Sequence, residues 1–415
     1  MNNLNTNILF IGGYYPKALE NLFLKKTKTS LDFAAHNLQE AIFKGFDQNK
    51  LNYQILNAPF LGSFPPYNKL LFVPEYCSED KKLKSISYVN LSYFKRWNIK
   101  KKIKTNIYEW CKNTKGEKVL LFYNFSTIGI INAIRKDFPT TKIILLVTDL
   151  PEFMASDNSF FTRINKKADN FLGTDIVIYL DNVDGYILLT EHMTERLPIG
   201  DKPWMVIEGI YNTNDNVTNV PKEPYKTILY TGNLGKRYGI LDLLEAFTEI
   251  SNPNFRLWLC GNGDGLEKIQ EIQKRDYRIE YFGILPRNEV LKLQKRATLL
   301  VNPRHSYEEY TKYSFPSKTM EYMASGTPTL MSKLPCLPKE YEPYIYFFDD
   351  ESIEGMKNKI IEICEKSQEE LSEFGQKAAE FIHTQKNEIA QTKKIIEFIS
   401  NLDMLCPQIK TKTVK

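Results

Sequence analysis

The sequence predicts an α/β protein of two doubly wound, Rossmann-like domains that face each other across a cleft, with a helical C-terminus. Three observations predict this fold class. The chain has 415 residues, which is too long for one ordinary core. Apolar runs of strand length alternate with helical patterns, as in parallel sheets with crossover helices. After Asp349 only helical patterns remain.

Two series of strands are expected, separated by a segment without periodicity. In the first half the expected strands are 7–11, 69–73, 118–123, 142–148 and 185–190, with helices such as 32–44 and 127–137 between them. In the second half they are 227–231, 255–260, 279–282, 298–302 and 329–332. The segment 212–225 is rich in Asn, Thr, Val and Pro and is interpreted as the linker. Ligands of open α/β sheets bind outside the carboxyl ends of the strands, so the site is expected there.

Composition indicates a globular protein without a targeting segment. Hydrophobic residues make up 42% of the chain, enough to bury two cores. The N-terminus lacks the pattern of a signal peptide, and no run approaches the roughly twenty apolar residues that span a bilayer. Six cysteines are scattered without a CxxC pair, which favours reduced thiols over disulfides or zinc. A cytoplasmic protein is expected.

The net charge of +5 is modest, but the cations are unevenly distributed. Nine Lys and Arg residues fall within Lys81–Lys104, interleaved with Tyr88, Tyr93, Phe94 and Trp97. Such a segment fits peripheral contact with an anionic membrane surface. Contact with nucleic acid and an ordinary solvated face are the other interpretations.

Glycines follow several of the expected strands. Gly12 and Gly13 come directly after the first strand, where a glycine pair lets backbone approach a ligand and offers N–H groups. The pair is not a GxGxxG fingerprint, so a dinucleotide cofactor is poorly supported, and a bare turn is an equal alternative. Gly261 lies in a similar strand-to-glycine segment, and Gly283 and Ile284 lie in another, where backbone groups can read the edge of a nucleobase.

The segment YTGNLGKRYGILDLLEAF, residues 230–247, combines glycine with two cations at the end of a strand. Gly232 and Asn233 precede Lys236 and Arg237, and a helix follows. A diphosphate needs both charge neutralisation and N–H donors, which this segment supplies. A solvated Lys-Arg turn is the alternative.

The strongest motif joins Val301–Arg304 to YSFPSKTMEYMASGTP, residues 313–328. Ser317 is expected as the N-cap of a helix, Pro316 suits its entry, and Gly326 and Pro328 end it. Met320, Met323 and Ala324 form a stripe for packing on the sheet, whereas Ser314, Ser317 and Glu321 share another face. The helix start suits a phosphate or sugar hydroxyls, and Glu321 can accept hydrogen bonds from a ribose diol. Alternatively, Glu321 caps the helix or pairs with Lys318.

From residue 226 to about 348 the chain resembles the C-terminal domain of family 4 glycosyltransferases, retaining enzymes of the GT-B fold, of the type that makes bacterial cell-surface polysaccharides. The order and spacing of the motifs carry this resemblance, while the N-terminal half matches only in general pattern. The resemblance implies an acceptor-binding domain at 1–211, a nucleotide-sugar-binding domain at 226–385, and a last helix within 386–415 that returns to the N-terminal domain.

The resemblance also implies roles for matched residues. Those for the donor diphosphate are Gly232, Lys236 and Arg237; for the base, Gly283 and Ile284; for the ribose, Glu321; and for the phosphates and sugar, Ser317, Lys318 and Thr319. Gly12, Gly13, Asn233 and Gly261 complete the expected nucleotide-sugar site. The first Glu of the family's paired-Glu motif falls on Tyr313, which leaves the identity of the donor sugar open.

Asp149 follows a strong strand and is expected in the site, where it can bind hydroxyls of the acceptor or donor. Asp before Leu-Pro is also an ordinary turn residue. His36 and His192 are weaker candidates. Lys236 and Arg237 are expected to stabilise the departing nucleoside diphosphate, so no metal or other cofactor is expected.

The function implied is transfer of a hexose, with retention, from a nucleotide-sugar such as a UDP-sugar to a glycan or lipid-linked acceptor. No nucleic-acid partner is expected, and the enzyme is placed in the cytoplasm with contact to the inner face of the membrane. Two alternatives remain open. One is a weakly catalytic or non-catalytic protein that binds glycans or nucleotide-sugars and assists another transferase. The other is a sugar-nucleotide epimerase of the same fold.

Overall fold

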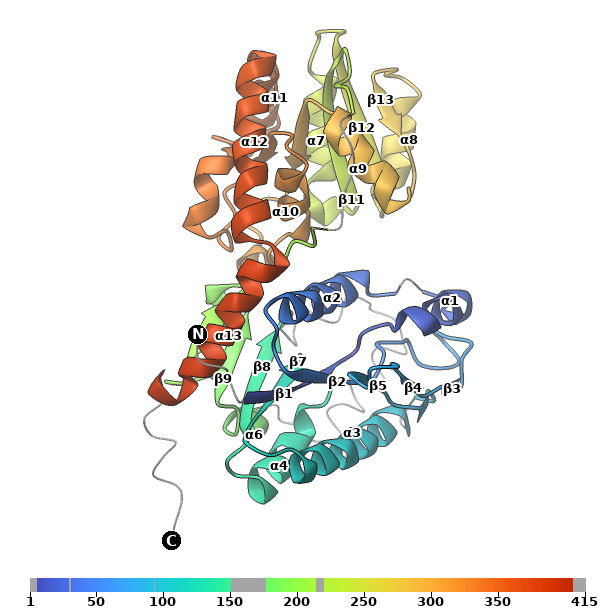
Figure 1. Cartoon of the computed structure of the whole chain (residues 1–415). Helices are drawn as coiled ribbons and strands as arrows, with labels where there is room; N and C mark the ends of the chain where they lie inside the picture. The colour runs from blue at the N-terminus through green and yellow to red at the C-terminus, as the bar shows by residue number, and fades with distance from the viewer. Residues whose placement is uncertain (1–5, 30, 93, 151–176, 214–219, 406–415) are drawn as a thin grey trace. The chain divides into compact units, whose positions relative to one another are not determined.

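The computed structural model describes residues 6–29, 31–92, 94–150, 177–213 and 220–405 (Figure 1). The chain divides into two compact units. One contains residues 1–210 together with 388–415, and the other contains Tyr211–Asn387. The five cysteines within the described ranges are free thiols, four of them buried.

The N-terminal unit is built on an eight-stranded sheet of order β10-β9-β8-β7-β1-β2-β5-β4. Its strands are β1 (Thr6–Gly12), β2 (Tyr53–Asn57), β4 (Tyr76–Cys77), β5 (Leu83–Ser85), β7 (Glu117–Tyr123), β8 (Lys142–Val147), β9 (Gly185–Leu188) and β10 (Trp204–Val206). All neighbouring pairs are parallel except β4 with β5. From β1 the chain proceeds to β2 on one side of the sheet, and from β7 to β8 and β9 on the other. The strand order therefore reverses between β1 and β7.

One prediction for this unit, a main-sheet strand at 69–73, is wrong. The run 69–73 yields only β3 (Phe72–Val73), which pairs antiparallel with β6 (Tyr88–Val89) in a separate two-stranded sheet. Four strands of the main sheet, β2, β4, β5 and β10, were not predicted from the sequence. The longest of them is β2, whose five residues YQILN include the exposed Gln54. A run this short carries little periodicity.

Five helices of the N-terminal unit are α1 (Lys17–Lys26), α2 (Phe33–Gln48), α3 (Phe94–Asn113), α4 (Ile131–Asp137) and α6 (Val177–Leu180). The C-terminal helix α13 (Glu388–Leu405) packs on α2 (Figure 1). Its apolar face adds Ile395, Phe398, Ile399 and Leu402 to the core of this unit. Gly45 permits this close approach, because a Cβ there would lie 2.2 Å from the carbonyl oxygen of Glu388.

The C-terminal unit is built on a six-stranded, fully parallel sheet of order β13-β12-β11-β14-β15-β16. Its strands are β11 (Lys226–Asn233), β12 (Phe255–Asn262), β13 (Ile279–Tyr281), β14 (Leu299–Asn302), β15 (Thr329–Met331) and β16 (Tyr346–Phe347). Sequence analysis predicted β11 to β15 and missed the two-residue β16. The doubly wound pattern predicted for both halves of the chain is confirmed.

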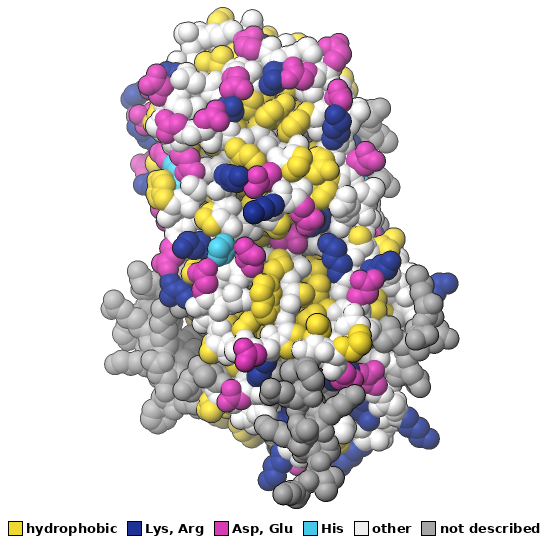
Figure 2. Space-filling model, turned by 90° about the vertical axis from the view of Figure 1, so that its left-hand side faces the viewer, with side chains coloured by type: hydrophobic (Ala, Val, Ile, Leu, Met, Phe, Trp, Pro, Cys, Tyr) yellow, Lys and Arg dark blue, Asp and Glu magenta, His cyan; other side chains and the backbone are white. Residues whose placement is uncertain are grey.

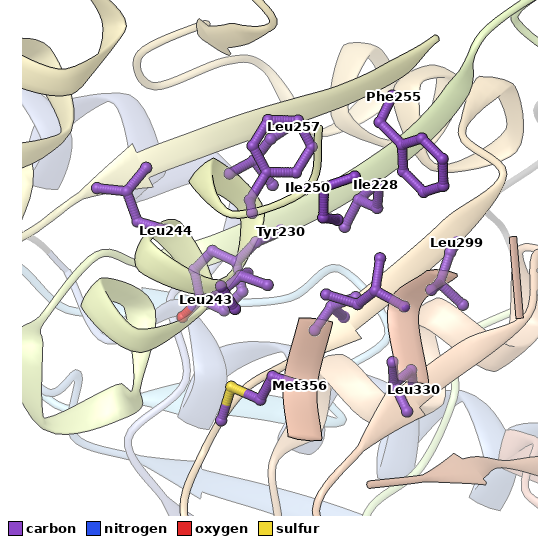
Figure 3. Close-up of a cluster of buried hydrophobic side chains, with 14 of the residues drawn as sticks. Ile228, Tyr230, Leu243, Leu244, Ile250, Phe255, Leu257, Leu299, Leu330 and Met356 are labelled. Carbon is purple, nitrogen blue, oxygen red and sulfur yellow. The ribbon is translucent and has the colours of Figure 1, made fainter. Parts of the chain in front are cut away.

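Helices cover both faces of this sheet. They are α7 (Ile240–Thr248), α8 (Leu266–Gln273), α9 (Arg287–Arg296), α10 (Ser317–Ala324), α11 (Ile353–Cys364) and α12 (Gln368–Gln385). Figure 3 shows a core cluster of this unit, in which Leu243 and Leu244 of α7 and Met356 of α11 meet strand residues such as Ile228 and Leu257. On a second cluster, the predicted stripe of Met320, Met323 and Ala324 packs against Met331 of β15 and Phe381 of α12.

The segment 212–225, interpreted as a linker, is partly packed onto the C-terminal unit. Lys222 donates hydrogen bonds of 2.8 Å to the carbonyl oxygen of Ala297 and to Oγ1 of Thr327. Glu223 accepts a 2.7 Å bond from Nε of Arg296. Residues 214–219 of the segment lie outside the described part of the chain.

Candidate functional site

The strand order of the C-terminal sheet places a candidate site at the carboxyl ends of β11 and β14. From β11 the chain proceeds to β12 and β13 on one side, and from β14 to β15 and β16 on the other. The loops after two such strands diverge to opposite faces of the sheet, and the crevice between them is where open α/β sheets bind ligands. The loop after β11 leads into the 3-10 helix η3 (Lys236–Tyr238), and the loop after β14 contains η4 (Glu309–Lys312).

Glycines at this edge let the loops approach one another. Gly232 and Gly261 are paired in register, with φ of +145° and +133°. A Cβ on Gly261 would lie 1.7 Å from the carbonyl oxygen of Gly232, so this position requires glycine. The N–H of Gly261 is already donated to the carbonyl oxygen of Gly283, at 2.9 Å. Gly283 itself has φ of +70° and open space where a Cβ would be, and Ile284 is 76% exposed.

The two cations after β11 are exposed and are the first two residues of η3, and Asn233, the last residue of β11, is also exposed. The backbone N–H of Lys236 donates a 2.7 Å bond to Oδ1 of Asp264, which ties the loops after β11 and β12 together. The guanidinium of Arg237 lies over the ring of Tyr310, 4.4 Å from its centroid, and 5.3 Å from that of Tyr238. These contacts hold Arg237 at the carboxyl edge.

A third cation, Arg304, was quoted in the sequence analysis but assigned no role. It lies two residues beyond β14, and its guanidinium is 4.8 Å from the centroid of Tyr238 and 5.9 Å from that of Tyr310. Its position directly after a strand was the signal available in the sequence. Its ring partners Tyr238 and Tyr310 lie about seventy residues upstream and six residues downstream, so the sequence alone does not show that these side chains meet.

Glu321 is buried in α10 and already holds three donors. Its Oε1 accepts bonds from Lys318 Nζ at 2.8 Å and Gln294 Nε2 at 2.7 Å, and its Oε2 accepts one from Arg287 Nη1 at 2.9 Å. Burial alone raises the pKa of Glu321, but the charges of Lys318 and Arg287 outweigh it and hold the pKa below its ordinary value. The pairing with Lys318 that was the alternative interpretation is therefore present, and Glu321 is a charged acceptor.

Two expectations for the start of α10 are corrected by the structure. The N-cap is Pro316, and Ser317, which is exposed, is the first helical residue. Thr319 is fully buried; its N–H bonds to the carbonyl oxygen of Pro316 and its hydroxyl contacts the sulfur of Met331 at 3.7 Å. Thr319 therefore packs the helix onto the sheet, which does not favour contact with a ligand.

Tyr313, at the position of the family's first Glu, is also buried, with 5% of its surface exposed. Its backbone N–H donates to the carbonyl oxygen of Tyr310 at 3.1 Å, at the end of η4. The helix α10 is further joined to β11 through Tyr322, whose hydroxyl accepts a 2.7 Å bond from the backbone N–H of Thr231.

The glycine pair of the N-terminal unit is enclosed by protein. The N–H of Gly13 donates to Oε1 of Gln39 at 3.0 Å, and a Cβ on Gly13 would lie 2.1 Å from the ring of Phe60. A Cβ on Gly12 would lie 2.2 Å from the same Gln39 oxygen. The expectation that this pair offers unhindered N–H groups is therefore wrong for Gly13.

His36 and Asp149 lie on other parts of the N-terminal unit's carboxyl edge. His36 is buried and stacked between Tyr14 and Tyr15, and its Nδ1 accepts the N–H of Tyr15 at 3.3 Å. Burial lowers the pKa of His36. Asp149 follows β8, is exposed, and accepts a 3.2 Å bond from the hydroxyl of Thr148. His192 is bonded to Glu195 at 2.7 Å.

Most cations of the C-terminal unit have a carboxylate partner. On the face shown in Figure 2, Lys and Arg side chains are interspersed with Asp and Glu side chains. Ion pairs include Arg278 with Asp276, Arg287 with Glu321 and Lys359 with Glu362. Lys236, Arg237 and Arg304 form no ion pair with any residue in the described ranges. The same ranges contain no group of three His, Cys, Asp or Glu side chains placed to hold a metal ion.

Comparison with known proteins agrees with this geometry. The family model described as "Glycosyl transferases group 1" matches residues 212–381, which is nearly all of the C-terminal unit. The match supports a glycosyltransferase. No curated protein matches the chain.

Solved structures show that the whole chain has the GT-B fold of two Rossmann-like domains. A glycosyltransferase from Rickettsia africae superposes with a TM-score of 0.62 at 14% identity, covering 98% of this chain and 99% of that one. Sucrose-phosphate synthase from Thermosynechococcus elongatus gives 0.61 at 14% identity, with 96% and 99% covered. A pneumococcal O-GlcNAc transferase in complex with UDP and GlcNAc gives 0.56 at 10% identity, with 96% and 99% covered.

Proposed function

We propose that this protein transfers a hexose from a nucleotide-sugar to a glycan or lipid-linked acceptor, with retention, in the synthesis of surface polysaccharides or glycoconjugates. The observation that carries the proposal is the carboxyl edge of the C-terminal sheet. There, cations without a carboxylate partner in the described part of the chain lie beside glycine-rich backbone, inside a unit that matches the group 1 glycosyltransferase model. A nucleoside diphosphate has the charge and the acceptor oxygens that such an edge binds.

Different residues of this unit bind different parts of the donor. Lys236 and Arg237 neutralise the diphosphate and stabilise the charge that grows on it as the sugar departs. The exposed backbone at Gly283 and Ile284 reads the base. Glu321, a charged acceptor, binds the ribose hydroxyls; its partner Arg287 has a half-exposed side chain and can move aside for them. A phosphate oxygen of the donor assists the acceptor hydroxyl, so no side-chain nucleophile is needed.

The N-terminal unit is assigned the acceptor, with Asp149 as a candidate for binding its hydroxyls. Helix α3 supplies the surface proposed to contact the inner face of a membrane. Phe94 and Trp97 are each 61% exposed on α3, and Lys101 lies over the Trp97 ring at 5.2 Å. Not all nine cations are available, because Lys95 donates inward to the carbonyl oxygen of Leu61 and Lys82 is paired with Asp47.

Membrane contact of this kind is peripheral. None of the helices in the described ranges is long and apolar enough to cross a bilayer. Each cation near an anionic surface contributes about 1 kcal/mol, and the attraction weakens with salt. Co-sedimentation with vesicles should require anionic lipid, decrease at high salt, and decrease in Trp97→Ser/Lys101→Ser. Binding that ignores lipid charge and salt would favour a solvated face and a soluble acceptor.

The activity is tested by a donor screen followed by turnover. Thermal unfolding in the presence of UDP-, GDP- and ADP-sugars should identify a stabilising donor, and release of the nucleoside diphosphate should then depend on an acceptor. Since the pneumococcal neighbour binds UDP, UDP-sugars are the first to test. Donor binding without release of nucleotide would favour a non-catalytic binding protein. Isomerisation of the donor sugar without an acceptor would favour an epimerase.

A further inference from the structure

Arg304 is a cation at the carboxyl edge that forms no ion pair with the residues the structure describes. Its Nη1 is buried and has no hydrogen-bond partner within the described ranges. A buried donor without a partner is unfavourable, and the loss is larger for a charged group than for a neutral one. An arginine in this state is suited to a ligand that brings an anionic acceptor.

Two carboxylates lie against His305, the residue that follows Arg304. His305, the next residue, is bonded through Nε2 to Asp242 at 2.5 Å, and its Nδ1 lies 3.4 Å from Glu351. Glu351 also accepts the N–H of Ser306 at 2.9 Å. Both carboxylates therefore have partners of their own among the described residues.

The aromatic rings that hold Arg304 also hold Arg237. Both guanidiniums lie over Tyr238 and Tyr310, whose rings meet edge to face at 6.1 Å. Two like charges kept near the same pair of rings repel each other unless an anion lies close to both. Gly239 brings the backbone of this loop against Pro303, since a Cβ there would lie 1.9 Å from the Pro303 carbonyl oxygen. The loops after β11 and β14 thus present their arginines at one place.

We propose that Arg304 is a third cation of the donor diphosphate site, positioned by Tyr238 and Tyr310, and that it donates to a phosphate oxygen. This assignment rests on the proposed function. In the transfer, the bond between the anomeric carbon and the phosphate oxygen breaks and its electron pair stays on the diphosphate. The sugar bonds to the acceptor oxygen, whose proton passes to a phosphate oxygen. Because negative charge grows on the diphosphate as the bond breaks, Arg304 stabilises the departing nucleotide more than the bound donor.

The inference is tested by binding of inorganic pyrophosphate to the full chain, measured by calorimetry, alongside UDP, GDP, ADP and their nucleosides. Arg304→Gln should weaken binding of pyrophosphate and of the preferred nucleoside diphosphate about ten- to a hundredfold. Binding of the matching nucleoside should not change. The affinity of Arg304→Lys for these anions should lie between those of Arg304→Gln and the wild type, because lysine keeps the charge but lacks the planar guanidinium that stacks on the rings.

Arg256→Gln is the matched control. Arg256 also lies over two tyrosine rings, at 4.0 Å from Tyr225 and 5.5 Å from Tyr277, but it is the second residue of β12 and so lies away from the carboxyl ends of the strands. The Arg256→Gln substitution should leave pyrophosphate binding unchanged. This result would distinguish loss of an anion site from loss of arginine–tyrosine packing.

Several outcomes overturn the inference. Pyrophosphate affinity of Arg304→Gln equal to that of the wild type overturns it, while loss of binding in Lys236→Ala/Arg237→Ala in the same experiment leaves the proposed function standing. An equal loss of nucleoside binding also overturns it. If Arg304→Gln does not fold, Arg304→Lys decides, and a loss of less than about twofold counts against the inference. A wild type that binds pyrophosphate but no nucleoside diphosphate overturns the proposed function, and one that binds neither overturns both.

Discussion

The carboxyl edges of the two sheets use glycine in opposite ways. In the N-terminal unit, Gly12 and Gly13 are enclosed by Gln39 and Phe60, and the N–H of Gly13 is consumed by a side-chain oxygen. In the C-terminal unit, Gly283 has open space around it and the adjacent Ile284 is exposed. Close packing at glycine also occurs in the C-terminal unit, at Gly261, so the difference between the edges lies in the added exposed loop at Gly283 and Ile284. What separates the two cases is the size of the side chains that converge on the loop, which a glycine pattern does not reveal.

Charge distinguishes the two edges in the same way. Near Gly13, the ionisable side chain is His36, which is buried between aromatic rings and has a lowered pKa. At the C-terminal edge, Lys236, Arg237 and Arg304 lack ion-pair partners among the described residues. Cations without ion-pair partners favour binding of an anion at the C-terminal edge. Aromatic packing around His36 instead stabilises the fold of the N-terminal unit.

The largest expected effect is on turnover after loss of the two cations that follow β11. Lys236→Ala/Arg237→Ala should lower kcat about a hundred- to a thousandfold, because the charge they meet grows in the transition state. Acceptor affinity should change little. Steady-state kinetics of nucleotide release measure both, with Lys268→Ala/Arg275→Ala as the control, since these exposed cations on α8 and just after it pair with Glu271. Near-normal turnover would place the diphosphate elsewhere.

Glu321→Gln sharpens the comparison by testing a buried charge at the C-terminal edge. Donor affinity should fall about ten- to a hundredfold if Glu321 binds the ribose. Because three donors converge on this carboxylate, stability should also fall by about 1–3 kcal/mol, towards the lower value since Lys318 and Arg287 are partly exposed. Calorimetric titration of the donor and urea unfolding measure the two effects.

Glu321→Gln should also change how the stability of the protein depends on pH. The pKa of Glu321 is lowered in the folded state, so its contribution to stability is present above the unfolded pKa and is lost as pH falls through the folded pKa. Wild type should therefore lose stability in acid more steeply than Glu321→Gln. Glu373→Gln, an exposed partner of Lys377 on α12, is the control. Equal slopes for wild type and Glu321→Gln would contradict the prediction.

Two glycine substitutions test the difference between the edges directly. Gly13→Ala should destabilise the protein by about 1–3 kcal/mol, because its methyl group collides with the Phe60 ring. Gly283→Ala meets no neighbouring atom, and its left-handed backbone should cost roughly 1 kcal/mol. Its larger consequence should be altered preference among nucleotide bases. Thermal unfolding and a donor screen distinguish the two, and a larger stability loss in Gly283→Ala would reverse the comparison.

The smallest expected effect is acid sensitivity from His36. Because burial lowers its pKa, the unfolded chain binds a proton more readily, and the folded state loses stability as pH falls below the unfolded value of about 6.5. His36→Gln should reduce this slope between about pH 7 and pH 5. The measurement is thermal unfolding across that range, and His192→Gln on the exposed side serves as the control. A variant that keeps the full slope would assign it to another group.

Much of the C-terminal unit could be predicted because its signals are local. The strands β11, β12 and β13 run into or towards a glycine, β14 and β15 are flanked by proline, and the Met320 stripe repeats at helical spacing. The weaker predictions depended on partners distant in the chain. β2 was missed because five residues carry little periodicity, and Thr319 was placed near a ligand although the sheet buries it.

By itself, then, the sequence determined two doubly wound units and the loop that carries Lys236 and Arg237 at the carboxyl edge of the second sheet. Tertiary structure alone decided which polar groups at that edge remain available. It closed Gly13 with Phe60 and surrounded Glu321 with Arg287 and Gln294. It also placed Arg304 near two rings, with its Nη1 unbonded to any described residue. The physical reason is that periodicity and turn chemistry act within a few residues, whereas burial and the pairing of charges depend on side chains that only the folded chain brings together.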